Sequence, residues 1–185
     1  MGRLPPTPRE ALSPEQLRVN DLIQAGRGRS GGLAGGPFGV WLRDPVLTEK
    51  AVALYHHLRH DLAAPQRLCE LAILVTARAW TAQYEWQAHE KHAVPAGLDA
   101  AIVDAIRHRR KPVFSKQDEE IVYELTLELQ ERRSLSEPTY ARAREVLGEA
   151  LLIELVTLVG FYTMLAILLV GFDVDIPKDA VKIPV

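Results

Sequence analysis

The residues with the clearest chemical potential lie in the segment CELAILVTARAWTAQYEWQAHEKH, from Cys69 to His92. Glu70 directly precedes an apolar run, and Glu85 and His89 lie near the other end of the segment. A histidine that is oriented by a carboxylate can donate or accept a proton near neutral pH. Glu70, Glu85 and His89 are therefore candidates for acid–base chemistry.

These side chains can meet only if the chain folds back between them. On one straight helix Glu70 and His89 would stand about 28 Å apart, since each residue adds about 1.5 Å of rise. Thr81 is the predicted N-cap of a second helix, because its hydroxyl can accept from free backbone N–H groups there. Helices over about residues 66–79 and 82–92 would then form an antiparallel hairpin that brings Glu70 level with His89. Glu85 and His89 are four residues apart and share one helix face.

This segment resembles the carboxymuconolactone decarboxylase family, whose all-α fold also serves the thiol peroxidase alkyl hydroperoxidase D. In the peroxidase branch a glutamate is followed twelve residues later by a Cys-x-x-Cys pair, and a histidine lies four residues after the second cysteine. Glu70 and His89 match the glutamate and the histidine, whereas Ala82 and Glu85 occupy the cysteine positions. The resemblance covers roughly residues 40–175, including the segment GPFGVWLRDP, which is similar to one in decarboxylase-like members.

The resemblance implies a decarboxylase that acts on a carboxylated unsaturated lactone, 4-carboxymuconolactone or a similar compound, without metal or organic cofactor. Such a reaction needs a stabiliser for the oxyanion and a donor that protonates carbon. His89 is the expected acid, Glu70 orients it, and Glu85 is expected to be protonated or to shuttle a proton. On spacing alone, an ordinary exposed pair between Glu85 and His89 would be preferred, and the match to the family reverses that preference.

Aromatic residues are expected to line the substrate site. Tyr84 can donate a hydrogen bond to the oxyanion, and Trp86 can supply an apolar wall. The glycine-rich residues 26–39 predict a loop that folds over the pocket, although a surface loop anchored by two aromatic rings is an equally good interpretation. The residues assigned to substrate binding are Tyr84, Trp86, Phe38, Trp41 and Tyr162.

Two other functions remain for comparison. A peroxidase needs a thiolate that attacks the peroxide and a second thiol that resolves the product. Ala82 and Glu85 supply neither, and Cys69 is the only cysteine, so this mechanism is rejected even though the chain could carry a peroxidase label by family inheritance. A non-catalytic oligomer that binds a small molecule accounts for the lost cysteines equally well. The resemblance implies a homo-oligomer, a trimer or a hexamer.

The composition restricts the classes of binding partner and the cellular location that the sequence predicts. The 22 basic and 24 acidic residues nearly balance, which indicates neither nucleic acid nor an anionic membrane as partner. One cysteine and no apolar signal segment predict a cytoplasmic protein. Metal is not expected, because only His56 and His60 have a suitable spacing and no carboxylate accompanies them. The basic run at residues 107–111 could bind an anion, but a solvated helix end is the simpler interpretation.

The rest of the chain predicts a single all-α bundle, with an arm, short helix and glycine-rich loop at 1–39, a helical domain at 40–175 and a tail at 176–185. Two capping boxes are expected, Ser13 with Gln16 and Ser115 with Asp118, and Asp44 is an expected N-cap. A break at Gly148 should precede a long apolar helix over residues 149–172. Its uncharged run of eighteen residues, 155–172, is attributed to a core or a subunit interface rather than to a membrane span.

Overall fold

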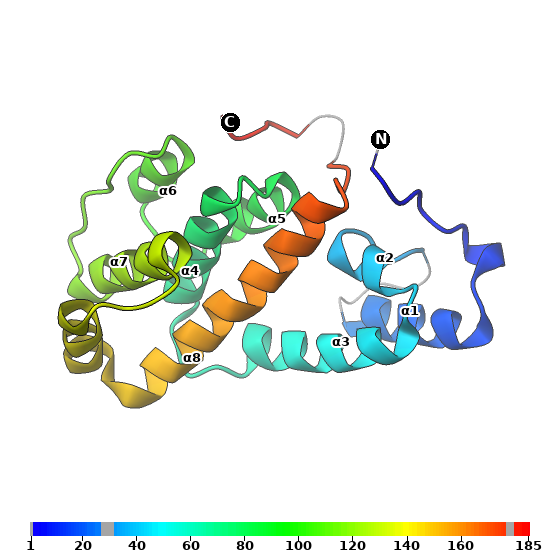
Figure 1. Ribbon diagram of the computed structural model, residues 1–185, viewed down its shortest axis with the longest axis horizontal. Helices are drawn as coiled ribbons and strands as arrows, with labels where there is room; N and C mark the ends of the chain where they lie inside the picture. The colour runs from blue at the N-terminus through cyan, green and yellow to red at the C-terminus, as the bar shows by residue number, and fades with distance from the viewer. Residues whose placement is uncertain (1, 27–31, 177–179) are drawn as a thin grey trace. The chain divides into compact units, whose positions relative to one another are not determined.

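The computed structural model describes residues 2–26, 32–176 and 180–185, and all regular secondary structure within them is helical (Figure 1). The predicted all-α class is therefore confirmed for this part of the chain. The elements are η1 (Arg9–Ala11), α1 (Pro14–Gly26), α2 (Pro37–Trp41), α3 (Pro45–His60), α4 (Gln66–Ala79), α5 (Gln83–Ala93), α6 (Ala100–Arg107), α7 (Gln117–Arg132) and α8 (Glu137–Gly171).

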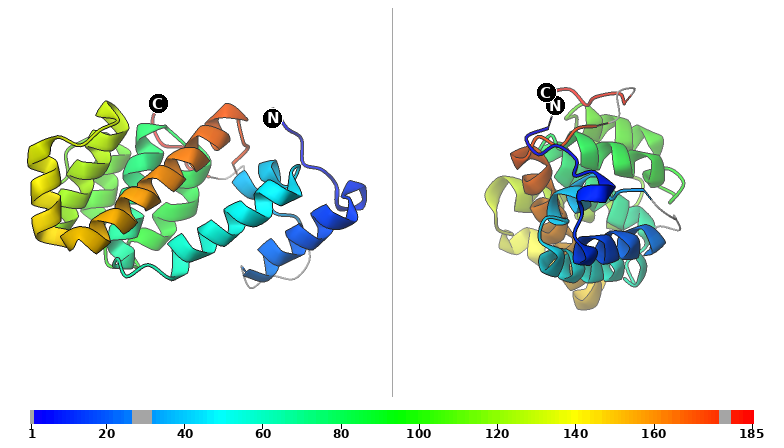
Figure 2. Two further views of the ribbon diagram at one scale, coloured as in Figure 1. Left: turned by 60° about the horizontal axis from the view of Figure 1, so that its bottom comes forward. Right: turned by 90° about the vertical axis from the view of Figure 1, so that its right-hand side faces the viewer.

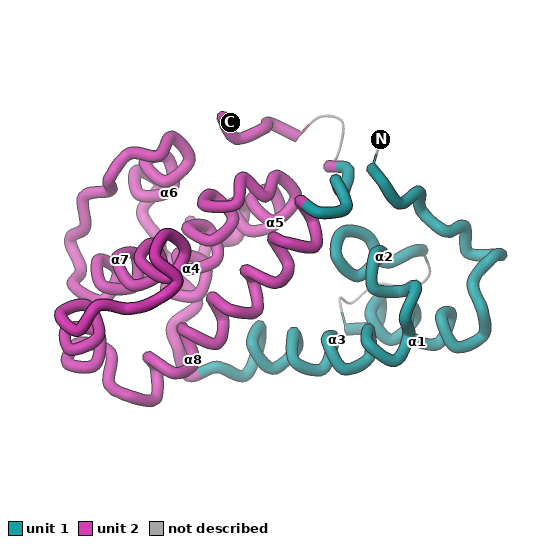
Figure 3. Tube along the Cα trace, viewed as in Figure 1, with its two compact units in different colours: residues 1–62, 171–175 teal, residues 63–170, 176–185 magenta. Residues whose placement is uncertain are grey.

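The chain forms two compact units, which Figure 3 distinguishes by colour. Unit 1 comprises Met1–Leu62 and Gly171–Asp175, and unit 2 comprises Ala63–Val170 and Ile176–Val185. Unit 1 contains α1, α2 and α3, whereas unit 2 contains α4 to α7 and nearly all of α8. The expected helical domain of residues 40–175 stays a prediction.

In unit 1, helices α1 and α2 pack against α3, and two predicted caps are confirmed. The backbone N–H of Ser13 donates to Gln16 at 2.9 Å, and the Gln16 N–H donates back to the Ser13 hydroxyl at 3.2 Å. Asp44 caps α3 by accepting from the Leu47 N–H at 3.0 Å. Both helix starts are thus encoded by local sequence.

The glycine-rich segment is not a loop over its whole length. Residues 27–31 of the predicted loop lie outside the described residues. At its end, Gly36 adopts a left-handed φ of 64° and Pro37 begins α2, so the expectation of a loop continuing to residue 39 is wrong. Proline is favoured at the first helical position because its fixed φ suits a helix and its missing N–H is not needed there.

Asn20 holds the residues after this segment against α1. Its side chain is fully buried, its Oδ1 accepts from the Ala34 N–H at 2.8 Å, and its Nδ2 donates to the Gly32 carbonyl at 3.0 Å. Asn20→Ala leaves both backbone groups without this partner and is expected to lower the free energy of unfolding by about 1–3 kcal/mol. Urea denaturation measures the change. Leu22→Ala, at an exposed position of the same helix, is the control, and an equal loss in both variants would contradict the assignment.

In unit 2, α4 is the central helix and packs against α5, α6 and α7; Figures 1 and 2 show it among these neighbours. Every residue from Leu68 to Arg78 is buried. A helix that is covered on all sides must be apolar on all sides, which explains why this segment shows a continuous apolar run. The predicted hairpin is present as α4 and α5, with its first helix at the predicted bounds.

The turn between α4 and α5 differs from the predicted N-cap at Thr81. The N–H of Ala82 donates to the Ala77 carbonyl at 2.8 Å, and the N–H of Thr81 donates to the Arg78 carbonyl at 3.2 Å. These two bonds are the Schellman ending of α4, in which the residue after the C-cap adopts the left-handed conformation. Thr81 accordingly has a φ of 51°, and α5 begins after Ala82 without a side-chain cap. Thr81 ends the first helix instead of starting the second.

The predicted capping box at Ser115 and Asp118 is also wrong. Lys116 is the N-cap of α7 and provides no side-chain hydrogen bond to the helix. The Asp118 carboxylate instead accepts from the Arg67 guanidinium on α4, which also donates to Glu119 at 3.0 Å. A charge-assisted pair between helices takes the place of the local cap.

Helix α8 is broken at Gly148, as predicted, where φ and ψ are 76° and 164°. Figure 2 shows the part after the break, in orange, as a straight rod. By length and composition alone this helix could cross a membrane, and 44% of its most apolar stretch of 18 residues is buried in the structure. Several apolar side chains on it are exposed, namely Ile153, Met164, Ile167 and Val170.

Candidate functional site

Glu70 and His89 meet in the interior of unit 2. Glu70 lies in α4 and His89 in α5, and their side chains come together because the two helices are antiparallel. The Oε2 of Glu70 is 2.8 Å from the Nδ1 of His89, and the residues are only 1% and 9% exposed. The predicted approach of these two residues across the hairpin is therefore observed.

This contact defines how the histidine can act. An ionised carboxylate only accepts hydrogen bonds, so acid–base use of this pair requires that Nδ1 donates its proton to the Glu70 oxygen. The contact fixes the imidazole tautomer and ring orientation, as second groups do for histidines that transfer protons. Proton exchange with a substrate would then run through Nε2, the other ring nitrogen.

Tyr162 positions the same histidine from a third helix. Its ring packs edge-on against the His89 ring, with centroids 5.0 Å apart and an interplanar angle of 90°. Tyr162 belongs to α8 and is 1% exposed. The imidazole of His89 is thus contacted by residues of α4 and α8, and the predicted role of Tyr162 in substrate binding stays a prediction.

Glu85 is the most unusual polar group of the site. It lies one turn before His89 and is 2% exposed, and neither carboxylate oxygen has a hydrogen-bond partner in the described part of the chain. Burial raises the pKa of this carboxyl well above its ordinary value of 4.5, because the apolar interior disfavours the charged form. A neutral carboxylic acid in such a place can donate a hydrogen bond or a proton, as the interpretation of a protonated Glu85 requires.

The exposed-pair alternative for Glu85 and His89 is contradicted by these observations. Both residues are buried, and the carboxylate that contacts His89 belongs to Glu70 on the neighbouring helix. A solvated i,i+4 pair would leave both groups at the surface and add only a few tenths of a kcal/mol to helix stability. Glu70 and His89 therefore form a buried pair across two helices, and Glu85 is buried one helix turn before His89.

Trp86 is fixed by neighbours of its own. Its side chain is fully buried, its Nε1 donates to Glu90 at 3.0 Å, and the Arg107 guanidinium lies 5.5 Å from the ring centroid. Arg107 also pairs with Glu90. These contacts join α5 to the end of α6, which gives Trp86 a clear role in packing. Its predicted contact with substrate stays a prediction.

The other residues assigned to substrate binding lie in different surroundings. Tyr84 is half-buried at the start of α5. Phe38 and Trp41 belong to unit 1, where they are 2% and 6% exposed and their ring centroids are 5.9 Å apart. Phe38 also packs on Tyr55, with centroids 5.0 Å apart. The expected role of Tyr84, Phe38 and Trp41 at the substrate stays a prediction.

Metal ligands are not grouped in the part of the chain that the structure describes. Within residues 2–26, 32–176 and 180–185, there is no cluster of three or more histidine, cysteine, aspartate or glutamate side chains that could hold a metal ion. The rings of His56 and His60 stand 5.8 Å apart, and His57 pairs with Asp61 at 3.6 Å.

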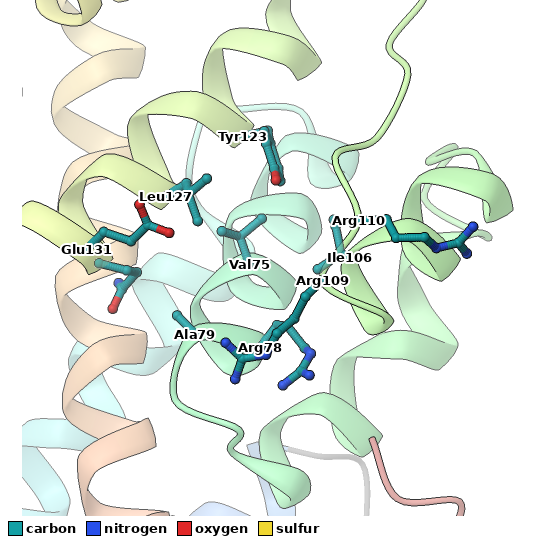
Figure 4. Close-up of a pocket in the computed structure, with 10 residues that line it drawn as sticks. Val75, Arg78, Ala79, Ile106, Arg109, Arg110, Tyr123, Leu127 and Glu131 are labelled. Atoms are coloured by element: carbon teal, nitrogen blue, oxygen red, sulfur yellow. The ribbon is translucent and has the colours of Figure 1, made fainter. Parts of the chain in front are cut away.

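Sequence reasoning did not predict a cavity in unit 2 between α4, α6 and α7 (Figure 4). Its volume is about 370 Å³, and its walls contain three arginines. Two of these, Arg109 and Arg110, lie in the basic run that was attributed to a solvated helix end. The third, Arg78, lies near the end of the largely apolar α4, and only the fold brings it to the same cavity as the other two.

No known protein-family model matches this chain, and no curated protein matches its sequence significantly. The resemblance to the carboxymuconolactone decarboxylase family therefore rests on the residues of the hairpin and on the neighbouring GPFGVWLRDP segment.

Proposed function

We propose that this protein is a cofactor-independent decarboxylase of the carboxymuconolactone decarboxylase type, with an alkyl hydroperoxidase D-like fold. Its substrate is a carboxylated unsaturated lactone, 4-carboxymuconolactone or a close analogue. The observation that carries the proposal is the buried contact between Glu70 and His89, 2.8 Å long. It joins the two residues that match the family pattern and supplies an oriented imidazole in a water-poor site.

The reaction divides into loss of CO2 and protonation. The bond between the substrate carboxylate and the ring breaks, CO2 leaves, and the electron pair passes through the conjugated ring to the lactone carbonyl oxygen. The resulting dienolate then takes a proton on carbon. The imidazolium form of His89 gives that proton through Nε2, and the charge of Glu70 stabilises the imidazolium beforehand. Solvent restores the proton on His89 after the product leaves.

Glu85 acts as a neutral acid in this scheme. An ionised carboxylate at this position would repel the carboxylate of the substrate, whereas a protonated one can donate a hydrogen bond to the developing oxyanion. Its burial raises its pKa well above the ordinary value and thereby favours the neutral form. Tyr84 is a second donor for the same oxygen in the proposed site.

The protein lacks the two cysteine thiols that the peroxidase alternative requires. Ala82 is a buried alanine at the position of the first cysteine, and Glu85 occupies that of the second. Cys69 is 1% exposed, and its thiol lies 3.7 Å from the Ala64 carbonyl oxygen as a weak donor. A thiol that is buried in apolar surroundings is poorly ionised and inaccessible to a peroxide. Acid–base chemistry is therefore the better account of this site.

A homo-oligomer, a trimer or a hexamer, is part of the proposal. The exposed apolar residues Ile153, Met164 and Ile167 follow one another on α8 at spacings that place them on one side of the helix. A second copy of the chain would cover this surface. We also place the protein in the cytoplasm, where its single cysteine stays reduced.

The direct test is release of CO2 from 4-carboxymuconolactone by the purified protein, with no metal or thiol added. Turnover supports the decarboxylase assignment. If the folded protein releases no CO2 from this compound, the substrate assignment is wrong, and a non-catalytic binding protein becomes the better account.

Glu70→Gln tests the positioning role of Glu70. The amide keeps the size of the side chain but removes the charge that stabilises the imidazolium beside it. The pH above which turnover is lost is therefore expected to fall by about one unit or more. The pH profile of kcat measures this shift. A lower rate with an unchanged profile would show that Glu70 only supports the structure, and Glu145→Gln, at an exposed position of α8, is the control for removal of a carboxylate.

A further inference from the structure

The cavity between α4, α6 and α7 contains two guanidinium groups that converge on one hydroxyl. Arg78 Nη1 donates to the Thr81 Oγ1 at 3.2 Å, and Arg109 Nη2 donates to the same oxygen at 3.1 Å. Figure 4 shows the two groups side by side, with Arg110 directed away from them. Two positive charges are thus held close together at one end of the cavity.

Neither charge is neutralised by a carboxylate in the described part of the chain. Arg78 is 5% exposed, and its Nε donates a hydrogen bond to the Arg107 carbonyl at 2.8 Å. Arg110 differs, because it pairs with Asp104. Burial and the neighbouring charge of Arg109 both lower the pKa of Arg78, which is the expected result of placing like charges together away from water. A bound anion would remove this repulsion.

The other side chains that line the cavity are suited to contact the uncharged part of an organic ligand. Val75, Ile106 and Leu127 contribute apolar side chains, and Tyr123 adds an aromatic ring. A volume of about 370 Å³ lies in the range of small-molecule sites, which are mostly apolar with a few polar groups that orient the ligand. The cavity therefore combines a cationic end with an apolar middle.

Glu131 limits the charge of the ligand. It also lines the cavity, on α7, and Figure 4 shows it apart from the two guanidinium groups. No ion pair joins Glu131 to Arg78 or Arg109 among the described residues. A ligand with a second negative charge at its far end would meet this carboxylate and be repelled.

We propose that this cavity is a binding site for an organic monoanion, whose carboxylate contacts Arg78 and Arg109 and whose apolar body lies between Val75, Ile106, Leu127 and Tyr123. A planar guanidinium binds a carboxylate through paired N–H groups, and this geometry favours a carboxylate over a spherical anion. The site is separate from Glu70, Glu85 and His89, and it does not depend on decarboxylase activity.

Binding of 2-naphthoate, measured by isothermal titration calorimetry, tests the proposal. Arg109→Asn is the main variant, because Arg109 is exposed with a φ of 54° and asparagine tolerates this left-handed conformation. Loss of a hydrogen bond to a charged group is expected to weaken binding by about tenfold to a hundredfold. Arg133→Asn is the matched control, since Arg133 is also exposed and left-handed but does not line the cavity, and it should bind as the parent does.

Two further probes define the ligand class and the location. The neutral 2-naphthamide and the dianion 2,6-naphthalenedicarboxylate should both bind more weakly than 2-naphthoate. A crystal structure with 6-bromo-2-naphthoate should place the bromine among Val75, Leu127 and Tyr123. The proposal is overturned if the parent does not bind 2-naphthoate at millimolar concentrations, if Arg109→Asn binds as tightly as Arg133→Asn, or if the bromine lies elsewhere.

Discussion

Replacement of His89 by alanine is expected to lower the rate of CO2 release from 4-carboxymuconolactone by about 10²- to 10⁴-fold, the usual contribution of a positioned general acid. The imidazole is the group whose Nδ1 lies 2.8 Å from the Glu70 carboxylate. The loss should appear in kcat rather than in KM, because the proton is transferred after the substrate has bound. Single-turnover measurements of CO2 release check this.

Two controls separate catalysis from folding. His89→Ala leaves the buried Glu70 carboxylate without its imidazole partner, so His89→Gln, which offers an amide in its place, is measured alongside it. His92→Ala, at an exposed position of the same helix, should retain the parent rate. If the parent is active and His89→Gln is equally active with its fold intact, His89 is not the acid. Loss of activity in His92→Ala to the same extent would likewise reject the assignment.

Glu85→Gln is expected to make the protein more stable than the parent at neutral and alkaline pH. The folded-state pKa of Glu85 is raised well above 4.5 by burial, so the native protein holds this proton more tightly than the unfolded chain does. The contribution of this proton to the free energy of unfolding is fully present below the pKa that Glu85 has in the unfolded chain. It is lost as the pH rises through the pKa that Glu85 has in the folded protein. In that window the parent should lose about 1.4 kcal/mol of unfolding free energy per pH unit relative to the variant.

Urea denaturation of both proteins from pH 4 upward measures this difference. The two curves should run together at low pH, where Glu85 is neutral in both the folded and unfolded states, and then diverge. Glu145→Gln, at an exposed position, should follow the parent at every pH. Parallel curves for the parent and Glu85→Gln would mean that Glu85 ionises as readily in the folded protein as in the unfolded chain.

The sequence was sufficient to predict the central contact of the site, because one antiparallel reversal near its middle brings Glu70 level with His89. The neutral state of Glu85 was also a prediction from its apolar surroundings, and its burial supports it. These features depend on helix periodicity and on one turn, both of which are local. The capping interactions at Ser13 and Asp44 were predictable for the same reason.

Long-range partners account for what the sequence did not reveal. Asp118 has the spacing of a capping residue, but Arg67, 51 positions away, takes its carboxylate. Arg78 lies in a largely apolar helix, and its place in the sequence carries no information about Arg109, which follows the end of α6 at Arg107. Trp86 lies between Glu85 and His89 in the sequence and was assigned to substrate binding, yet its side chain contacts Arg107 and Glu90. Each of these outcomes depends on helices that are distant in sequence.

The left-handed conformation of Thr81 has a consequence for the rigidity of the hairpin. A β-branched residue at a φ of 51° is strained, at a cost of about 1–3 kcal/mol, and glycine would adopt this backbone without that cost. Glycine, however, would give the unfolded chain more conformations to lose on folding, and it would offer no oxygen to Arg78 and Arg109. Threonine thus tolerates local backbone strain, and in return it restricts the conformations of the turn between α4 and α5. This turn sets the level at which Glu70 faces His89.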